Sequence, residues 1–248
     1  MSIKTNRQFM KSDFAESVHQ RSDQAKGLPF PPLQKEIPAG SADLITLPGP
    51  DPSLAIKPDF YQLLEDRESR RQYTGGALSL AELSFLLYCT QGVKELLGDG
   101  YASRRVVPSG GARHPFETYL AVNRVESLTP GIYRYLPLDH QLTFLEASDT
   151  LPGLLAEANL GQRFVGQAAC VFAWSCIPYR AEWRYMHHAH KNMLLDAGHI
   201  CQNLYLAAEA LGLGTCAIGA YDQAAMDALL ELDGEDEYVI YLAPVGKI

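Results

Sequence analysis

The sequence lacks an excess of basic residues. Its 248 residues include 21 lysines and arginines against 29 aspartates and glutamates, which gives a formal net charge of −8 at pH 7. General nucleic-acid binding depends on clustered lysine and arginine that release counterions, so this balance argues against that class of protein. An anionic ligand would need a local group of cations that acts against the overall negative field.

Long apolar stretches are also missing. No run approaches the roughly 18 residues that a transmembrane helix requires. The N-terminal residues MSIKTNRQFMKSDF contain no apolar core of a signal peptide. We therefore expect a soluble, cytoplasmic protein that makes no membrane contact.

Cysteine is sparse, and the patterns of several enzyme classes are absent. The five cysteines lie in apolar stretches and include no CxxC pair, which predicts buried free thiols in a reducing compartment. The chain has no GxSxG, P-loop or HExxH sequence. Ser109 and His114 are close in sequence but have no evident acidic partner, which argues against a hydrolase.

Proline is concentrated at one end of the chain. Residues 1–58 hold eight of the fifteen prolines, and proline fixes φ and removes backbone donors. We therefore predict an extended N-terminal arm over residues 1–57 and a folded domain over residues 58–248. The apolar residues of the arm favour an ordered segment that lies on the domain or on a partner subunit; a disordered tail is the alternative.

The folded region alternates predicted helices and strands. A first helix is expected from Pro58 to near Arg71, and a second follows a capping box that starts at Ser79. Further helices are expected over 151–159, about 181–211 and 222–232. Strands are expected over 118–125, 132–136, 141–146, 168–177, 214–218 and 238–245. This pattern predicts an α+β fold with one central mixed or antiparallel sheet surrounded by helices.

A basic segment and two glycine-containing segments are candidates for ligand binding. Arg67 and Arg71 would share a helix face with Ser69 between them, a donor set that suits a phosphate; a solvated charge run is the alternative. Glycines after Pro108 and at 219 would let a backbone approach a flat ligand closely; ordinary turns are the alternative. The segments are Pro108-Ser109-Gly110-Gly111-Ala112-Arg113-His114-Pro115 and Gly212–Tyr221.

Histidines gather near the start of the long predicted helix. Three of the four residues from His187 to His190 are histidines, but no cysteine or carboxylate stands at a spacing that completes a zinc site, so we predict no metal. Arg184, Tyr185 and His190 are candidates for substrate contact, with ordinary surface residues as the alternative.

Taken in order, these segments resemble the nitroreductase superfamily, and the stretches 108–117 and 196–221 resemble its SagB-type dehydrogenase branch. The resemblance covers roughly residues 58–248 and implies a nitroreductase-like fold, an FMN cofactor and a homodimer with FMN at the interface. It implies that the cofactor contacts Arg67, Ser69, Arg71, Pro108, Ser109, Gly110, Ile218, Gly219, Ala220 and Lys247. It places the Pro108–Pro115 stretch on the flavin site across the dimer, with His114, Arg184, Tyr185 and His190 toward the substrate.

Two positions depart from the family pattern. Ala112 replaces the asparagine of the superfamily, which removes one side-chain contact. Arg184-Tyr185 stands where azoline oxidases have a Lys-Tyr pair, and arginine stays protonated and is a poor base.

The resemblance implies an FMN-dependent oxidoreductase that transfers a hydride through flavin N5, with NAD(P)H as donor and no catalytic side chain. Arg71 would stabilise the anionic reduced flavin and the Gly219 N–H would hold N5. The alternatives are an azoline-oxidising, peptide-modifying dehydrogenase and a flavin-binding module without turnover.

Overall fold

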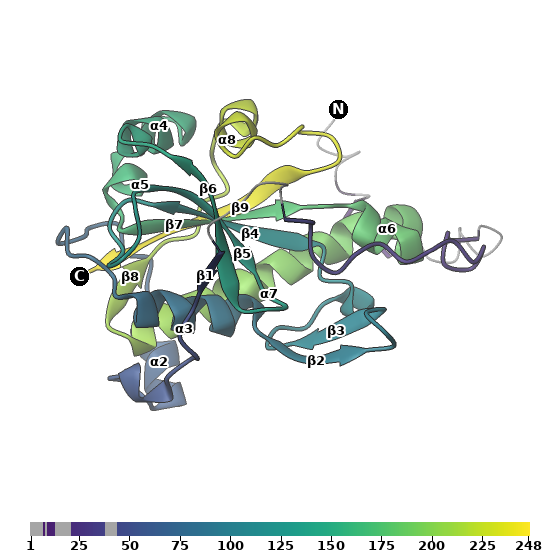
Figure 1. The fold of residues 1–248 in the computed structure, drawn as a ribbon, viewed down its shortest axis with the longest axis horizontal. Coiled ribbons are helices and arrows are strands. Elements are labelled where there is room, and N and C mark those ends of the chain that lie inside the picture. The colour runs from purple at the N-terminus through teal and green to yellow at the C-terminus, as the bar shows by residue number, and fades with distance from the viewer. Residues whose placement is uncertain (1–6, 8, 13–20, 38–43) are drawn as a thin grey trace.

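The computed structural model describes residue 7 and residues 9–12, 21–37 and 44–248. Its centre is a seven-stranded sheet in the order β1-β6-β5-β4-β7-β9-β8, in which every neighbouring pair is antiparallel. The strands are β1 (Leu44–Thr46), β4 (Phe116–Val122), β5 (Gly131–Leu136), β6 (Gln141–Ala147), β7 (Cys170–Cys176), β8 (Leu213–Thr215) and β9 (Tyr238–Lys247). The predicted α+β class with a central sheet is confirmed (Figure 1).

Helices cover both faces of this sheet (Figure 1). The α-helices are α2 (Phe60–Asp66), α3 (Leu80–Gln91), α4 (Leu151–Ala158), α5 (Arg163–Gln167), α6 (Tyr179–Tyr185), α7 (Ala189–Ala210) and α8 (Gln223–Leu229). Short 3-10 turns lie at η2 (Pro52–Leu54), η3 (Gly110–Ala112) and η4 (Met186–His188). A separate hairpin pairs β2 (Val93–Leu97) with β3 (Ala102–Arg105); the sequence analysis predicted neither of these strands.

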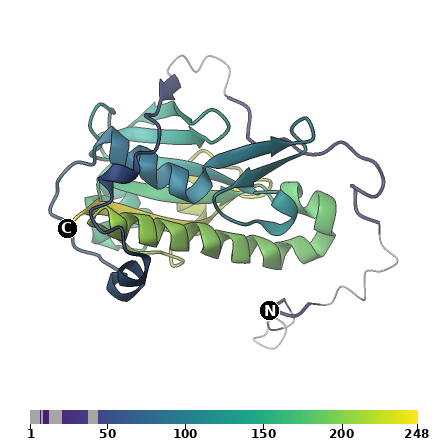
Figure 2. The ribbon, with the colours of Figure 1, turned by 90° about the horizontal axis from the view of Figure 1, so that it is seen from below.

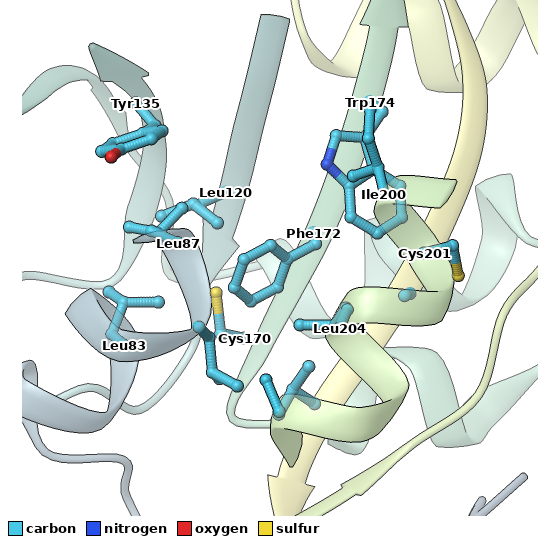
Figure 3. Close-up of a cluster of buried hydrophobic side chains, with 14 of the residues drawn as sticks. Leu83, Leu87, Leu120, Tyr135, Cys170, Phe172, Trp174, Ile200, Cys201 and Leu204 are labelled. Carbon is cyan, nitrogen blue, oxygen red and sulfur yellow. The ribbon is translucent and has the colours of Figure 1, made fainter. Parts of the chain in front are cut away.

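The central strand β7 explains why the sheet has two cores. Its seven residues are all buried, and alternate side chains of a strand point to opposite faces. Phe172 and Trp174 pack toward α3 and α7 (Figure 3), whereas Val171 and Ala173 pack toward α4, α5 and α8. The apolar run over 168–177 is therefore confirmed as a central strand covered on both faces.

The cysteines lie within this packing. Among them, Cys170, Cys176, Cys201 and Cys216 are buried free thiols, as predicted, while Cys89 is partly exposed. Burial raises the pKa of the Cys201 thiol to about 12 and that of Cys89 to about 11. These thiols serve as apolar packing groups.

The long helix predicted over about 181–211 is two helices. Met186 has φ 52° and ψ −138°, which lies outside the right-handed helical region. The chain therefore turns between α6 and α7, and α7 alone runs along the sheet (Figure 2). This break decides where Arg184 and Tyr185, at the end of α6, are placed.

The part of the N-terminal arm that the structure describes is bound to the domain through its carbonyl oxygens. Buried arginines donate to these oxygens: Arg105 to Leu33 at 3.1 Å and Arg134 to Glu36 at 2.6 Å. The Trp183 indole N–H donates to the Leu28 carbonyl at 3.1 Å. An extended segment cannot pair these carbonyls itself, so the guanidinium groups supply the missing donors. The arm boundary at residue 57 stays a prediction, although β1 already belongs to the main sheet.

Candidate functional site

The first candidate region is residues 67–74, which we name the arginine segment. The predicted helix up to Arg71 is wrong: α2 ends at Asp66 with Arg67 as its C-cap, and residues 67–74 are irregular. The Arg70 N–H donates to the Thr215 carbonyl at 2.9 Å and the Thr74 N–H to the Lys247 carbonyl at 2.9 Å. These bonds hold the segment beside the C-terminal end of β9.

A tyrosine on α7 joins the arginine segment to the strand that follows α7. The Tyr205 hydroxyl lies 2.8 Å from the Ser69 hydroxyl and accepts the Ala217 N–H at 2.8 Å. The Arg67 guanidinium carbon lies 5.3 Å from the centre of the Tyr205 ring. Tyr205 thus brings Arg67 and Ser69 together with Ala217, the residue before the candidate residues Ile218, Gly219 and Ala220. The sequence analysis missed Tyr205 because a single tyrosine on a long helix has no distinguishing pattern.

The cations of the arginine segment differ in their partners. Arg70 pairs with Glu68 at 2.6 Å and with Glu209 at 3.4 Å, so its charge is compensated within the chain. Within the described ranges, no carboxylate oxygen lies within 4.0 Å of the Arg67 or Arg71 guanidinium. Arg71 lies instead above the Phe164 ring of α5, 6.0 Å from its centre. Two cations are therefore left for an external anion.

A pocket of about 660 Å³ lies beside the arginine segment, and Arg71 is part of its lining. It lies within the range of about 300–1,000 Å³ that is usual for small-molecule sites. Its lining consists of Glu68, Ser69, Arg70, Arg71, Gln72, Tyr73, Thr74 and Ile248. The Arg70 Nε atom is buried there without a hydrogen-bond partner. This unsatisfied donor fits a site whose polar groups are completed by a ligand.

The remaining residues predicted to contact the cofactor near the arginine segment differ in exposure and in hydrogen-bond partners. Lys247 donates to Glu82, which also closes the predicted capping box of α3; an ammonium has three donors, so this pairing leaves two. Ile218 is buried and exchanges backbone bonds with Leu242. Gly219 and Ala220 are exposed, and nothing lies within 4 Å of the position that a Gly219 Cβ would take. Gly219 thus offers an open approach to its backbone.

The second candidate region is residues 108–112, which we name the glycine loop. The Ser109 hydroxyl donates to Asp196 Oδ2 at 2.6 Å, and the Gly110 N–H donates to the same oxygen at 3.1 Å. Ser109 also accepts the His114 N–H at 2.9 Å. The polar groups of Ser109 and Gly110 therefore hold the loop on α7, and Pro108 is the member that stays exposed. Asp196 belongs to the matching 196–221 stretch, but the sequence analysis gave it no role.

Burial dominates the electrostatics of the glycine loop. Burial raises the pKa of the Asp196 carboxyl, and the hydrogen bonds from Ser109 and Gly110 oppose that shift. His114 is 4% exposed, and its Nε2 lies 3.0 Å from the Ser103 carbonyl. Burial and the nearby Arg105 charge lower the pKa of His114 to about 3. In this chain His114 is an interior residue that bonds to β3, and its predicted contact with a substrate stays a prediction.

The predicted substrate residues fall into two places. A Cβ built on Gly111 would stand 2.6 Å from the Tyr185 hydroxyl and 3.1 Å from Arg184 Cδ, so both side chains lie against the glycine loop. His190 instead pairs with Glu182 at 2.6 Å and lines a separate pocket of about 380 Å³. In the described part of the chain, no three His, Cys, Asp or Glu side chains are arranged to hold a metal ion.

The arginine segment and the glycine loop meet α7 at different points. Tyr205 and Asp196 are nine residues apart, which is about 14 Å along a helix that rises about 1.5 Å per residue. One copy of the chain therefore presents two separate surfaces. Several apolar side chains are exposed on α2 and α7 and on the segment before α2: Ile56 (70%), Phe60 (64%), Tyr61 (69%), Leu64 (45%), Leu194 (49%) and Leu195 (53%). In the described residues, no helix has both the length and the apolar character to cross a membrane.

Comparison with known proteins gives consistent matches. The family model described as "Nitroreductase family" matches residues 64–247. A nitroreductase-like protein of Methanocaldococcus jannaschii is 33% identical over 195 residues, covering 77% of this chain and 94% of that protein. The trifolitoxin-processing protein TfxB of Rhizobium leguminosarum bv. trifolii is 33% identical over 134 residues, covering 52% of this chain but 36% of that protein.

A solved structure extends the match to the fold. The crystal structure of a nitroreductase-like protein of Ralstonia eutropha has a TM-score of 0.68 and 28% identity, and the alignment covers 89% of this chain and 98% of that chain. The family match spans both candidate regions, and it supports an oxidoreductase of the flavin type. On this evidence, the chain belongs to the nitroreductase family.

Proposed function

We propose that the protein is an FMN-dependent oxidoreductase that works as a homodimer, with NAD(P)H as electron donor. The observation that carries this proposal is the pair Arg67 and Arg71, which have no carboxylate partner among the described residues. Arg71 lines a pocket of about 660 Å³, and Arg67 lies against Tyr205, which bonds to Ser69 in the same lining. The phosphate of FMN carries close to two negative charges, and arginine forms strong charge-assisted bonds to phosphate. In a chain of net charge −8, such a local pair is what retains an anion.

The residues around the pocket have separate tasks. Arg67, Ser69 and Lys247 would bind the phosphate, and Arg71 would place a positive charge against the electron-rich edge of the ring. The open backbone at Gly219 would donate to the ring edge. When bound, FMN supplies hydride transfer through its N5 atom, so no side chain of the protein needs to act as a nucleophile.

A second copy of the chain would complete the site. The glycine loop lies about 14 Å along α7 from Tyr205, and its satisfied bonds to Asp196 give it a fixed shape. The exposed apolar side chains of α2 and α7 supply an area that two copies can bury. In this arrangement the Pro108 end of the loop of one copy would close the pocket of the other.

The test is direct. The purified protein should be yellow and contain close to one FMN per chain, and anaerobic NADH or NADPH should bleach it. Retained yellow that neither donor bleaches would favour a flavin-binding module without turnover. A colourless protein that cannot be reconstituted with FMN would overturn the proposal.

A second candidate function is azoline oxidation in a peptide. It is supported by the similarity to TfxB, whose name describes toxin processing. It is opposed by Arg184, which replaces the basic lysine expected beside Tyr185 and stays protonated. Oxidation of a cyclised peptide by the yellow protein, without NAD(P)H, would favour this candidate. The cytoplasmic location stays a prediction.

A further inference from the structure

Arg184 differs from the other arginines around it in how its charge is compensated. Arg180, one turn earlier in α6, forms a buried ion pair with Glu117, in which both side chains are at most 2% exposed. Arg113 donates to the carbonyls of Arg180, Tyr101 and Pro31. Within the described residues, Arg184 donates one hydrogen bond, from Nη1 to the Tyr101 hydroxyl at 3.2 Å. In the part of the chain that the structure describes, no carboxylate lies within 4.0 Å of it.

The position of the Arg184 guanidinium is fixed from two sides. Its central carbon lies 5.4 Å from the centre of the Tyr185 ring, a distance at which a cation is attracted to the face of a ring. Tyr101 also accepts a bond from Gln24 of the N-terminal arm at 2.7 Å, and its ring packs edge-on against Trp183. The arm and α6 together therefore hold Tyr101, which in turn orients Arg184.

The guanidinium stands directly beside the glycine loop. The built Cβ of Gly111 lies 3.2 Å from Arg184 Nε and 2.6 Å from the Tyr185 hydroxyl. Gly111 has φ 62°, a conformation that favours glycine, so the loop can approach this closely. Arg184 is half-buried, and most of its five N–H donors have no partner among the described residues.

Resting on the proposed function, we propose that Arg184 and Tyr185 select substrates that carry a carboxylate. A planar guanidinium with unfilled donors binds a carboxylate through two parallel bonds, and the Tyr185 hydroxyl supplies a further donor at the same place. The nearby cation of Arg113 adds to the positive potential there. Gln24 and Tyr101 are positioning residues that act through Arg184.

The test compares two substrates of similar shape and different charge, 4-nitrobenzoate and 4-nitrobenzyl alcohol, in steady-state turnover by the FMN-loaded dimer. Arg184→Gln should raise the KM for 4-nitrobenzoate by about 10- to 100-fold, the range expected for a lost bond to a charged group. The kcat, and the KM for the alcohol, should change less than about twofold. Tyr101→Phe should give a smaller rise in the same KM, and Arg184→Lys should recover part of it.

Binding supplies a second readout. Benzoate, but not benzamide, should perturb the flavin absorbance of the oxidised wild-type protein, and Arg184→Gln should abolish that response. The matched control is Arg104→Gln, an exposed arginine on the β2–β3 hairpin that pairs with Glu95. This variant should behave like the wild type in both assays.

The outcomes separate this inference from the proposed function. Suppose that the flavin is reduced, that both nitro compounds turn over, and that Arg184→Gln has the same KM as the wild type for each of them. The enzyme assignment then stands, and the carboxylate preference is wrong. If no flavin can be loaded, the proposed function is wrong, and calorimetric titration of the protein with benzoate still decides the role of Arg184. Arg184-dependent heat supports that role, and its absence overturns it.

Discussion

The arginine segment and the glycine loop both contact α7, but their polar groups have opposite kinds of partners. In the arginine segment, Arg67 and Arg71 have no acidic partner in the described residues, and Arg71 lines a pocket. In the glycine loop, Ser109 and Gly110 donate to the buried Asp196. The first region keeps its binding capacity for a ligand, whereas the second uses its hydrogen bonds to maintain its own shape.

This difference predicts that variants of the two regions separate ligand binding from stability. Changes at Arg67 and Arg71 should remove a ligand and leave the fold intact, because these two cations form no ion pair with the described residues. Changes beneath the glycine loop should destabilise the fold first. The predictions that follow run from the largest expected effect to the smallest.

The largest effect is expected for the double variant Arg67→Ala/Arg71→Ala. Each lost bond to a charged phosphate should cost about 1.5–3 kcal/mol, so FMN affinity should fall by a factor of roughly 10² to 10⁴. The protein should purify as a folded apoprotein with a circular dichroism spectrum like that of the wild type. Arg104→Ala is the matched control and should retain FMN. Normal FMN content in the double variant would show that the arginine segment is not the phosphate site.

Next in size is the effect of Leu195→Asp on dimer formation. Leu195 is 53% exposed on α7, and burial of a leucine contributes about 1.5–3 kcal/mol, so the dimer dissociation constant should rise at least about 10-fold. Sedimentation velocity over a concentration series measures this shift. Leu154→Asp is the control, because Leu154 is 42% exposed on α4, which covers the opposite face of the sheet from α7. An equal effect of both substitutions would refute the proposed interface.

Asp196→Ala should have a moderate effect, mainly on stability. The change leaves the Ser109 hydroxyl and the Gly110 N–H without their acceptor, which should cost about 2 kcal/mol and lower the Tm by about 4–8 °C. Differential scanning calorimetry checks this value, with Glu157→Ala, an exposed position on α4, as control. If the variant lost FMN at an unchanged Tm, the glycine loop would act in ligand binding and not in stability, and the proposed difference between the two regions would be wrong.

The smallest effect, counted per pH unit, is a pH dependence that comes from His114. The pKa of His114 in the folded protein, about 3, lies below its unfolded value of about 6.5. The stabilisation by the neutral ring is therefore complete above about pH 6.5 and is lost as the pH falls toward 3. Over pH 6 to 4.5, the free energy of unfolding of the wild type should decrease by up to about 1.4 kcal/mol per pH unit more than that of His114→Gln.

Urea unfolding at several pH values measures this slope. His187→Gln, at an exposed histidine of η4, is the control and should follow the wild type. Parallel curves for the wild type and His114→Gln would mean that His114 is not a buried neutral residue. In that case it would return as a candidate for substrate contact.

Most of the fold could be predicted from local patterns. The apolar run over 168–177 indicated the doubly covered strand β7, and the Ser79–Glu82 capping box is formed as expected. Asp222 caps α8 through the Ala225 N–H at 2.9 Å. These features depend on residues close in sequence, so local chemistry is sufficient to specify them.

Features that depend on distant partners could not be predicted. The strands of the β2–β3 hairpin have exposed, charged positions and no clear alternation. The break at Met186 has neither glycine nor proline to indicate it. His114 resembled a substrate residue because its sequence neighbours include Ser109 and two glycines, whereas its burial comes from the fold around β3 and Ser103.

The sequence by itself determined most of the helices and the main-sheet strands, the local caps, and a set of arginines and glycines suited to a phosphate and a flat ring. The tertiary structure decided which of these groups are available. Arg70 pairs with Glu209, which is 139 residues away, and Ser109 donates to Asp196, which is 87 residues away. Arg67 and Arg71 are left without a carboxylate in the described chain. The physical reason is that hydrogen bonds and ion pairs depend on distances of a few ångströms, and long-range packing sets those distances.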